Sequence, residues 1–551
     1  MNIYKIMGVL YEKIEEITSD VNKYAEVLGV DREEAEADVD NFKKFKDISI
    51  GNGAARTYVI NFYTKLLISY YNFKDEAVKE YIDFDDILNN DIRIIYELML
   101  ERYDIGFLID KYELKFEITE EDFRKVAEIE EKEIRYHFRK VVDKVRIIAT
   151  ILYSIEDGQD VIDSLQYHNI NEIGFNKKDF IWISYKSSTY YISFLSFKDE
   201  DILINIQKKS TARIKPQYSP ENPIVVSNKD NSNRITVAGY ISTPTDKHIY
   251  FNERIFNLPD ISLEAMRDEL RTIDGLIYDL TEINMEGKGK YLVTGADMGV
   301  GKTTFLVAML GKCPNKWSIG IIDQQDETQA DVKYPDKDIR MLIINPVVGI
   351  KETFEKALKM KREILNVGEI AAPEHAAELI NVGLRLNSGV GGTLHSFTPY
   401  EVVTNCRNLM VRSDMYDSSE GNVAEADIAR CMDLIYHLKR HPKNPKRIVM
   451  DKIVEIQYVE QEHFIEPCLV GSKSEKISRL LDMAQLALSK YLYRKNYRYN
   501  DIFSYDIDKD DWIPVNLPSD DYFRKMVETK FVSEEKIEKW KQRFLEKKRV
   551  I

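Results

Sequence analysis

A glycine-rich loop between an apolar strand and a helix is the first feature of this sequence that could carry out chemistry. The segment begins at Lys290 and reads KYLVTGADMGVGKTTFLVAML, with a strand predicted over residues 291–293 and a helix predicted to begin near Lys302. Glycines in such a loop allow backbone N–H groups to close around phosphate groups at the helix N-terminus. The residues predicted to contact a bound nucleotide are Gly299, Val300, Gly301, Lys302, Thr303 and Thr304.

Two side chains of this loop have predicted roles toward ATP. The Lys302 ammonium would reach the β- and γ-phosphates, and the Thr303 hydroxyl would bind Mg²⁺. Ala296 stands where the common form of the motif has glycine, although Gly295 lies beside it. The alternative is a chance glycine-rich loop, and the strand before it and the helix after it argue against that alternative.

Acidic side chains follow a second apolar strand, in the segment WSIGIIDQQDETQADV. Asp323, Asp326 and Glu327 are predicted to stand at the carboxyl end of that strand. Carboxylates in this place can hold Mg²⁺ or its water ligands, and Glu327 is the residue predicted to support the metal. An ordinary acidic turn is the alternative interpretation.

A third apolar run, residues 364–367, ends in Gly368-Glu369. A carboxylate at the tip of a strand next to the loop strand can orient a water molecule for attack on the γ-phosphate, so Glu369 is the predicted catalytic base. Asn366 is unusual in a buried strand. A surface glutamate that happens to follow a core strand is the alternative.

A histidine is the fourth in this series of polar residues at the ends of apolar strands, and it lies in the segment SGVGGTLHSFTP. Gly389, Gly391 and Gly392 precede His395 and are predicted to let this strand pass close to a bound nucleotide. The imidazole could donate a hydrogen bond to the γ-phosphate or to Glu369. A purely structural histidine is the alternative.

Strand-like and helix-like segments alternate over residues 259–470, which predicts a doubly wound α/β domain that positions these tips at one edge of a sheet. Residues 156–258 are rich in β-branched and aromatic residues and predict a small α+β domain. Residues 471–551 predict a helical C-terminal extension. Its last helix is expected after Ser533, with an apolar face made of Ile537, Trp540 and Phe544.

Residues 1–155 predict a helical domain. The apolar residues between Ile3 and Leu28 recur in steps of three and four, which predicts one amphipathic helix ended by Gly29. Asp31 and Glu34 predict a capping box at the start of the next helix. A self-contained bundle is the favoured interpretation of this region, and docking of a partner is the alternative.

Composition excludes several classes of protein. The 551 residues contain 44% hydrophobic residues and carry a net charge of −15, so we expect several folded domains and no general nucleic-acid binding. Four scattered cysteines argue against a zinc site or a disulfide framework. The N-terminus does not resemble a signal peptide, and a cytoplasmic location is expected. Two basic runs, residues 437–447 and 539–549, are expected to be solvated, with anionic lipid or an acidic partner as alternatives.

The four motifs taken in order resemble the ATPases of the type II and type IV secretion superfamily, which drive pili, secretion and conjugation. TGADMGVGKTT, IIDQQDET, ILNVGEI and GGTLHS are similar to the Walker A, Asp, Walker B and His boxes of that family. NLMVR and DIARCMDLIYHLKR extend the similarity, which covers about residues 156–470. The branch that powers tight-adherence pili is the most similar one.

The resemblance implies a RecA-like P-loop ATPase domain, ATP and Mg²⁺ as ligands, and a homohexamer. It also implies a polytopic membrane protein of a pilus or secretion machine as partner, and attachment to the membrane through that partner. The γ-phosphate would be sensed by His395. Two arginines of the small domain, in SNRITV and NERIF, are similar to nucleotide-binding arginines of the family, which suggests Arg234 and Arg254. Ordinary surface arginines are the alternative.

Three departures from the family pattern put hydrolysis in question more than binding. Ala371 replaces the arginine that usually follows Gly-Glu, and Asp323-Gln324 replaces Glu-Asp. Residues 385–387 read Arg-Leu-Asn in place of Thr-Gly-His. Two other functions therefore stay open, a RecA-like nucleic-acid translocase and a nucleotide-binding scaffold that hydrolyses slowly or not at all.

Overall fold

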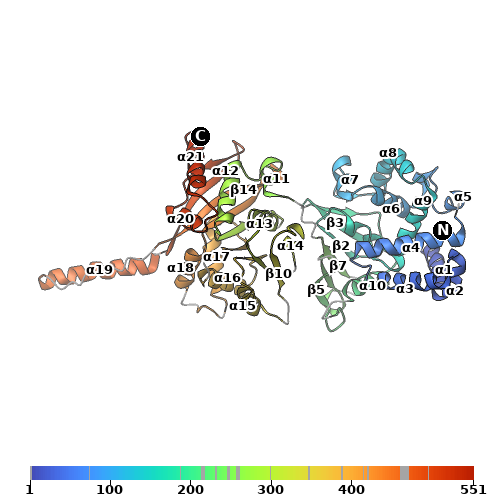
Figure 1. The fold of residues 1–551 in the computed structure, drawn as a ribbon, viewed down its shortest axis with the longest axis horizontal. Helices are drawn as coiled ribbons and strands as arrows, with labels where there is room; N and C mark the ends of the chain where they lie inside the picture. Colours follow the sequence, from blue (N-terminus) through green and yellow to red (C-terminus); the bar gives the residue numbers. More distant parts are fainter. Residues whose placement is uncertain are drawn as a thin grey trace. The chain divides into compact units, whose positions relative to one another are not determined.

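A computed structural model describes residues 3–550 except 74, 187, 213–216, 230–232, 245–248, 256–260, 298, 325, 345–347, 386–388, 414, 418–420, 460–470 and 494. The chain divides into two compact units, Met1–Asn257 and Leu258–Ile551. Figure 1 shows the helices and strands of each unit. The second unit begins one residue before position 259, where the sequence predicted the start of the P-loop domain.

The first unit combines helices with one seven-stranded sheet. Its helices are α1 (Ile3–Ser19), α2 (Val21–Leu28), α3 (Arg32–Asp47), α4 (Gly53–Tyr71), α5 (Asp75–Val78), α6 (Ile92–Arg102), α7 (Ile105–Tyr112), α8 (Glu120–His137), α9 (Val141–Glu156) and α10 (Glu200–Thr211). Its strands are β1 (Glu117–Ile118), β2 (Glu172–Lys177), β3 (Phe180–Tyr185), β4 (Ser188–Ile192), β5 (Ile224–Asn228), β6 (Arg234–Ala238) and β7 (Tyr250–Arg254). Their order in the sheet is β1-β4-β3-β2-β7-β6-β5.

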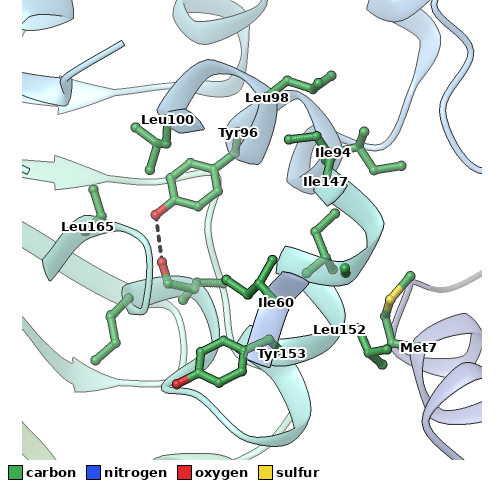
Figure 2. Packing of buried hydrophobic residues seen from close by; sticks show 14 of the residues in the cluster. Met7, Ile60, Ile94, Tyr96, Leu98, Leu100, Ile147, Leu152, Tyr153 and Leu165 are labelled. Atoms are coloured by element: carbon green, nitrogen blue, oxygen red, sulfur yellow. Dashed lines mark hydrogen bonds between the residues drawn. The ribbon is translucent and has the colours of Figure 1, made fainter. Parts of the chain in front are cut away.

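One hydrophobic core joins the helical part and the sheet of this unit. It runs from Met7 in α1 to Ile255 after β7 and includes residues of the strands. Figure 2 shows the helical side of this core, where the Tyr96 hydroxyl donates a hydrogen bond of 2.7 Å to the carbonyl of Val161. The two regions predicted as separate domains, 1–155 and 156–258, therefore bury their apolar surfaces against each other.

The predicted single N-terminal helix is two helices in the structure. Asp20 interrupts it, and the Asp20 carboxylate accepts hydrogen bonds from the backbone N–H groups of Asn22 and Lys23 at the start of α2. Because an aspartate at this position satisfies the free N–H groups of a new helix, the apolar stripe continues across a bend. Gly29 ends α2 in the left-handed conformation, and Asp31 caps α3, as predicted.

The second unit contains a nine-stranded sheet. Its helices are α11 (Leu263–Asp268), α12 (Gly275–Glu286), α13 (Lys302–Leu310), α14 (Ala330–Lys333), α15 (Ile350–Lys359), α16 (Pro373–Arg385), α17 (Val402–Met410), α18 (Gly421–Cys431), α19 (Lys473–Tyr493), α20 (Asp520–Glu528) and α21 (Glu534–Val550). Its strands are β8 (Tyr291–Gly295), β9 (Ile319–Asp323), β10 (Ile339–Ile343), β11 (Ile364–Val367), β12 (Gly389–His395), β13 (Leu434–His441), β14 (Asn444–Tyr458), β15 (Tyr497–Asp506) and β16 (Asp511–Pro514).

The strand order is β10-β9-β11-β12-β8-β13-β14-β15-β16, with parallel pairing from β10 to β13 and antiparallel pairing beyond. Alternate residues of β8 enter two different cores: Tyr291 and Val293 pack in one, and Leu292 packs in the other. Because successive side chains of a strand point to opposite faces, helices must cover both faces of this sheet. The mixed α/β fold that the sequence predicted for this region is confirmed.

The C-terminal segment contributes strands as well as helices. β15 and β16 extend the sheet, which the prediction of a helical extension did not include. α19 lies within the connection of the β14–β15 hairpin, whose strands are closed by the pairing of Tyr458 with Tyr497. The side chains of residues 473–482 in α19 are all exposed. The predicted last helix is present as α21, with Trp540 and Phe544 buried.

Candidate nucleotide-binding site

Four neighbouring parallel strands bring the predicted site residues to one edge of the sheet. The strands β9, β11, β12 and β8 are adjacent in that order. Asp323 ends β9, Glu369 follows β11, His395 ends β12, and the glycine-rich loop follows β8. Because the carboxyl ends of parallel strands lie at the same edge, these four tips lie together at one edge of the sheet.

The glycine-rich loop has two glycines in the left-handed conformation and leads directly into a helix. Gly299 and Gly301 have φ values of 70° and 76°, a region that other residues rarely adopt, and α13 begins at Lys302. Gly295 is required by packing, since a Cβ there would lie 2.6 Å from a Val300 methyl and 2.9 Å from the Leu438 carbonyl oxygen. The small residue needed at the start of the loop is therefore Gly295, which explains why Ala296 is tolerated at the next position.

Lys302, His395 and Glu369 form a continuous chain of contacts. The Lys302 Nζ lies 3.3 Å from His395 Nδ1 and 3.1 Å from His395 Nε2. His395 Nε2 lies 3.4 Å from Glu369 Oε1. Lys302 is buried, whereas the side chains of His395 and Glu369 are 41% and 44% exposed and thus open to a ligand.

The Lys302 ammonium lies near both ring nitrogens of His395, and one neutral tautomer of the ring suits both Lys302 and Glu369. A lysine ammonium can only donate, so it needs a ring nitrogen that has a free lone pair. The neutral tautomer that satisfies both neighbours accepts from Lys302 at Nδ1 and directs its Nε2–H toward Glu369. His395 therefore links the cation of the loop to the carboxylate predicted to act as base.

Hydrogen bonds from β12 fix the backbone on both sides of Glu369. The Thr393 hydroxyl donates to the carbonyl of Gly368 at 2.6 Å, and the Ile370 N–H donates to the carbonyl of Thr393 at 2.8 Å. Thr393, which supplies the hydroxyl and the carbonyl of these two bonds, is buried. The position of the Glu369 carboxylate is thus tied to the strand that carries His395.

Asp323 organises the acidic loop by its contacts with backbone groups. Its carboxylate accepts hydrogen bonds from the N–H groups of Gln324 at 2.7 Å, Glu327 at 2.9 Å and Thr328 at 3.3 Å. A Cβ at Gly368 would lie 2.7 Å from the Asp323 carboxyl carbon, so Gly368 makes room for this group. Among the acidic residues predicted at this tip, Asp323 shapes the loop, and Glu327 is held within it by its own N–H.

Gly391 in β12 leaves room for the Tyr291 side chain to reach across β12 to the next strand. Tyr291 in β8 and Asn366 in β11 flank Gly391, and the Tyr291 hydroxyl donates to Asn366 Oδ1 at 2.7 Å. A Cβ at Gly391 would lie 2.6 Å from the Tyr291 ring and 2.7 Å from Asn366 Oδ1. This hydrogen bond explains the asparagine in a buried strand, which the sequence identified as unusual but did not explain.

His375 and Gln324 are neighbours of the site that the sequence did not single out. His375 Nδ1 accepts from the Ala371 N–H at 3.3 Å, and His375 Nε2 lies 3.3 Å from the Gln324 amide. Burial lowers the pKa of His375, which keeps it neutral. Ala371 stands where the family pattern has arginine, and His375 follows it by four residues. This spacing is the signal in the sequence that could have identified His375.

The predicted arginines Arg234 and Arg254 belong to the first unit. They are direct partners in the pairing of β6 with β7, and both are partly exposed. Arg254 also faces Glu172 of β2. Arg254 thus has the acidic Glu172 on one side and the basic Arg234 on the other.

The predicted Mg²⁺ ligands are oxygen donors of the type that this ion prefers. Within the described ranges, no group of three or more His, Cys, Asp or Glu side chains could hold a metal ion. Mg²⁺ at a nucleotide takes most of its ligands from phosphate and water and needs one or two from the protein. The Thr303 hydroxyl and the Glu327 carboxylate fit that need. Cys313, Cys406 and Cys431 are buried free thiols, and Cys468 lies outside the described residues.

Two further expectations concern the membrane and the His box. In the part of the chain that the structure describes, no helix has the length and apolar content needed to cross a membrane. Leu386 and Asn387, which depart from the family pattern before His395, lie outside the described residues.

Comparison with protein-family models and with curated protein sequences gives no match. Solved structures do match. The VirB11 ATPase from the Brucella suis type IV secretion system is 15% identical, with 52% of this chain and 93% of that chain covered and a TM-score of 0.29. The Legionella pneumophila ATPase DotB is 14% identical, with 57% and 84% covered and a TM-score of 0.39. The pilus retraction motor PilT is 11% identical, with 59% and 86% covered and a TM-score of 0.36.

At such low identity, the roles of individual residues must follow from their own contacts in this structure. In this structure, the glycine-rich loop, a histidine and a glutamate lie at adjoining strand tips.

Proposed function

We propose that this protein is an ATP-hydrolysing motor of the type II and type IV secretion superfamily. The observation that carries the proposal is the chain of contacts from Lys302 through His395 to Glu369 at the mouth of the glycine-rich loop. In this proposal, the cation that binds phosphate and the carboxylate that acts as general base lie on either side of one imidazole.

Each residue has a defined part in the proposed reaction. The backbone N–H groups of the loop and the Lys302 ammonium bind the phosphates of ATP, which requires Lys302 to leave the ring of His395. The Glu369 carboxylate accepts a proton from the attacking water. The Nε2–H of His395 then donates either to Glu369 or to the γ-phosphate. Mg²⁺, when bound, neutralises phosphate charge, and Thr303 and Glu327 are its proposed protein ligands.

Arg234 and Arg254 are proposed to contact the nucleotide phosphates. Their adjacent positions on β6 and β7 support this role, because two neighbouring cationic side chains can contact one polyanion. An arginine that contacts the transferred phosphoryl group can contribute about 10³-fold to the rate. In keeping with the sequence resemblance, we further propose a cytoplasmic homohexamer that works on a polytopic membrane protein of a pilus or secretion machine.

The deciding experiment compares nucleotide binding and hydrolysis in the full chain and in Glu369→Gln. We expect the variant to bind ATP with nearly unchanged affinity and to hydrolyse it about 10²-fold more slowly, because only the base is lost. Glu374→Gln is the matched control, since Glu374 is an exposed glutamate nearby in α16. Equal turnover in Glu369→Gln and wild type would remove Glu369 from the role of base.

A scaffold that hydrolyses slowly is the second candidate. The observation that favours it is Ala371, which stands at the position of the family's arginine and uses its N–H to bond His375. Binding of ATP without turnover in the assembled oligomer would select this candidate. Stimulation of turnover by DNA or RNA, falling steeply with salt, would instead select a nucleic-acid translocase.

A further inference from the structure

The basic run at residues 437–447, which the sequence predicted to be a solvated turn, belongs to a hairpin beside the glycine-rich loop. β13 pairs with β8 in parallel from Leu434 opposite Tyr291 to His437 opposite Thr294. β8 ends one residue later, at Gly295, whereas β13 continues to His441. On the side away from β14, the last residues of β13 therefore run alongside the loop.

The hairpin contacts the loop at three points. The Leu438 carbonyl lies against Gly295, and the nearest atom to a Cβ built at Gly301 is a methyl group of Ile448, 3.6 Å away. Between these contacts, Arg440 Nη2 donates a hydrogen bond of 3.3 Å to the carbonyl oxygen of Gly299. A charged side chain from a distant part of the sequence thus contacts the backbone at the tip of the predicted phosphate cradle.

Two register shifts in the hairpin direct the Arg440 side chain toward that carbonyl. The pairing of β13 with β14 shifts register between His437 and Leu438 and again between Arg440 and His441. Such bulges turn a side chain away from its regular direction and are common beside active sites. The tip is held rigidly, because His441 Nδ1 accepts from the N–H groups of Lys443 and Asn444 at 3.1 and 3.0 Å.

The bond to Gly299 also determines where the next N–H group points. In a trans peptide the C=O and the N–H point in opposite directions. When the Gly299 carbonyl points toward Arg440, the N–H of Val300 must point the other way. Gly299 has a φ of 70°, the left-handed conformation that turns successive N–H groups toward an anion.

We propose that Arg440 is a positioning residue for nucleotide binding: its guanidinium holds the Gly299 carbonyl outward and so keeps the Val300 N–H directed at the phosphates. This inference rests on the proposed function of the loop. Without Arg440, the peptide between Gly299 and Val300 can rotate, and a carbonyl oxygen would then face the phosphates. The expected consequence is weaker binding with an intact catalytic apparatus.

The test measures the Kd of Mg·ATP and the steady-state kinetics of the full chain in Arg440→Ala and Arg440→Gln. We expect the Kd and KM to rise about tenfold, equivalent to about 1.4 kcal/mol, while kcat changes less than about twofold. Lys439→Ala is the matched control, because Lys439 is the exposed neighbouring cation on the same strand, and it should behave as wild type. Arg440→Lys retains the charge and a donor and should recover part of the affinity.

Amide hydrogen exchange provides a readout that a general loss of stability would not produce. Binding of Mg·ATP should slow exchange at the Val300 amide in wild type and should do so much less in Arg440→Gln, with α13 equally protected in both. Equal Kd and equal Val300 protection in wild type and both variants would overturn the role of Arg440. Failure of wild type itself to bind Mg·ATP would instead overturn the proposed function.

Discussion

Lys302 and His395 are 93 positions apart in the sequence, yet the Lys302 Nζ lies 3.1 Å from His395 Nε2. The loop lysine is therefore in contact with the histidine at the end of β12, and the Glu369 carboxylate is the next group beyond it. Phosphate that draws Lys302 toward itself would release the imidazole. Occupancy of the loop would thereby change the surroundings of the proposed base.

Replacing His395 by alanine tests this link. We expect His395→Ala to bind ATP about as well as wild type and to hydrolyse it about 10²-fold more slowly, because a hydrogen-bond donor next to the reacting phosphate is lost. Binding by equilibrium titration and turnover of the assembled oligomer are the measurements. Phe397→Ala, two positions away and exposed, is the control. Normal turnover in His395→Ala would identify a structural histidine.

Removing the Asp323 carboxylate should loosen the acidic loop. Three backbone N–H groups lose their acceptor in Asp323→Ala, and we expect the free energy of unfolding to fall by about 1–3 kcal/mol. Urea unfolding measures this loss, and limited proteolysis should locate new cleavage between residues 324 and 328. Asp323→Asn keeps one acceptor oxygen and should lie between wild type and Asp323→Ala. Unchanged stability in both variants would contradict the role of Asp323.

A methyl group at Gly391 should disturb the crossing of Tyr291 over β12. The added carbon would lie within 2.7 Å of both Tyr291 and Asn366, and we expect Gly391→Ala to lower the free energy of unfolding by about 1–3 kcal/mol. Gly421→Ala is the control, because its added carbon meets only an Arg407 methylene at 3.6 Å. Equal unfolding midpoints for the two variants would show that β8, β11 and β12 make room for the added methyl group at no cost, which would contradict the prediction.

The buried histidine of β13 predicts a dependence of stability on pH. Burial lowers the pKa of His437 from 6.5 to about 4, and Nδ1 lies 2.9 Å from the Thr294 hydroxyl. Because the unfolded chain binds a proton on this residue at a higher pH than the folded chain does, stability is fully present above pH 6.5 and falls toward pH 4. The loss is about 3 kcal/mol.

Urea unfolding between pH 7.5 and 4.5, in wild type and in His437→Gln, isolates this contribution. The difference between the two proteins should shrink as the pH falls, because only wild type must take up a proton at this position. A difference that stays constant over the range would show that His437 is not the group responsible.

The sequence predicted the strand tips of the site because each tip is a local pattern: an apolar run followed by a glycine, a carboxylate or a histidine. Lys302, Glu369 and His395 could be named for this reason. Asn366 shows the limit of such patterns, since its partner Tyr291 comes from a strand two positions away in the sheet. Which strands become neighbours depends on long-range pairing, which local spacing does not contain.

The basic run at residues 437–447 shows a second limit. Its composition is that of a solvated turn, and only the register shifts of β13 direct Arg440 to the loop. The strands β15 and β16 are a third case. The residue types of these two segments are compatible with an edge strand and also with a loop. They become strands by pairing with a sheet formed by residues earlier in the chain. In the N-terminal helix pair, the apolar periodicity was predicted, and the break was not, because Asp20 acts through local hydrogen bonds to the backbone N–H groups of Asn22 and Lys23, which leave the apolar spacing unchanged.

The last helix has a consequence for how this protein is made. The Trp540 indole donates to the carbonyl of Leu276 in α12 at 2.9 Å, and Phe544 is buried in the same core as the strand that leads into the glycine-rich loop. During synthesis, the second unit therefore cannot close its core until α21 has emerged from the ribosome. Until then, the apolar surface of α12 stays uncovered, and a chain that stops before α21 is a natural substrate for chaperones and proteases.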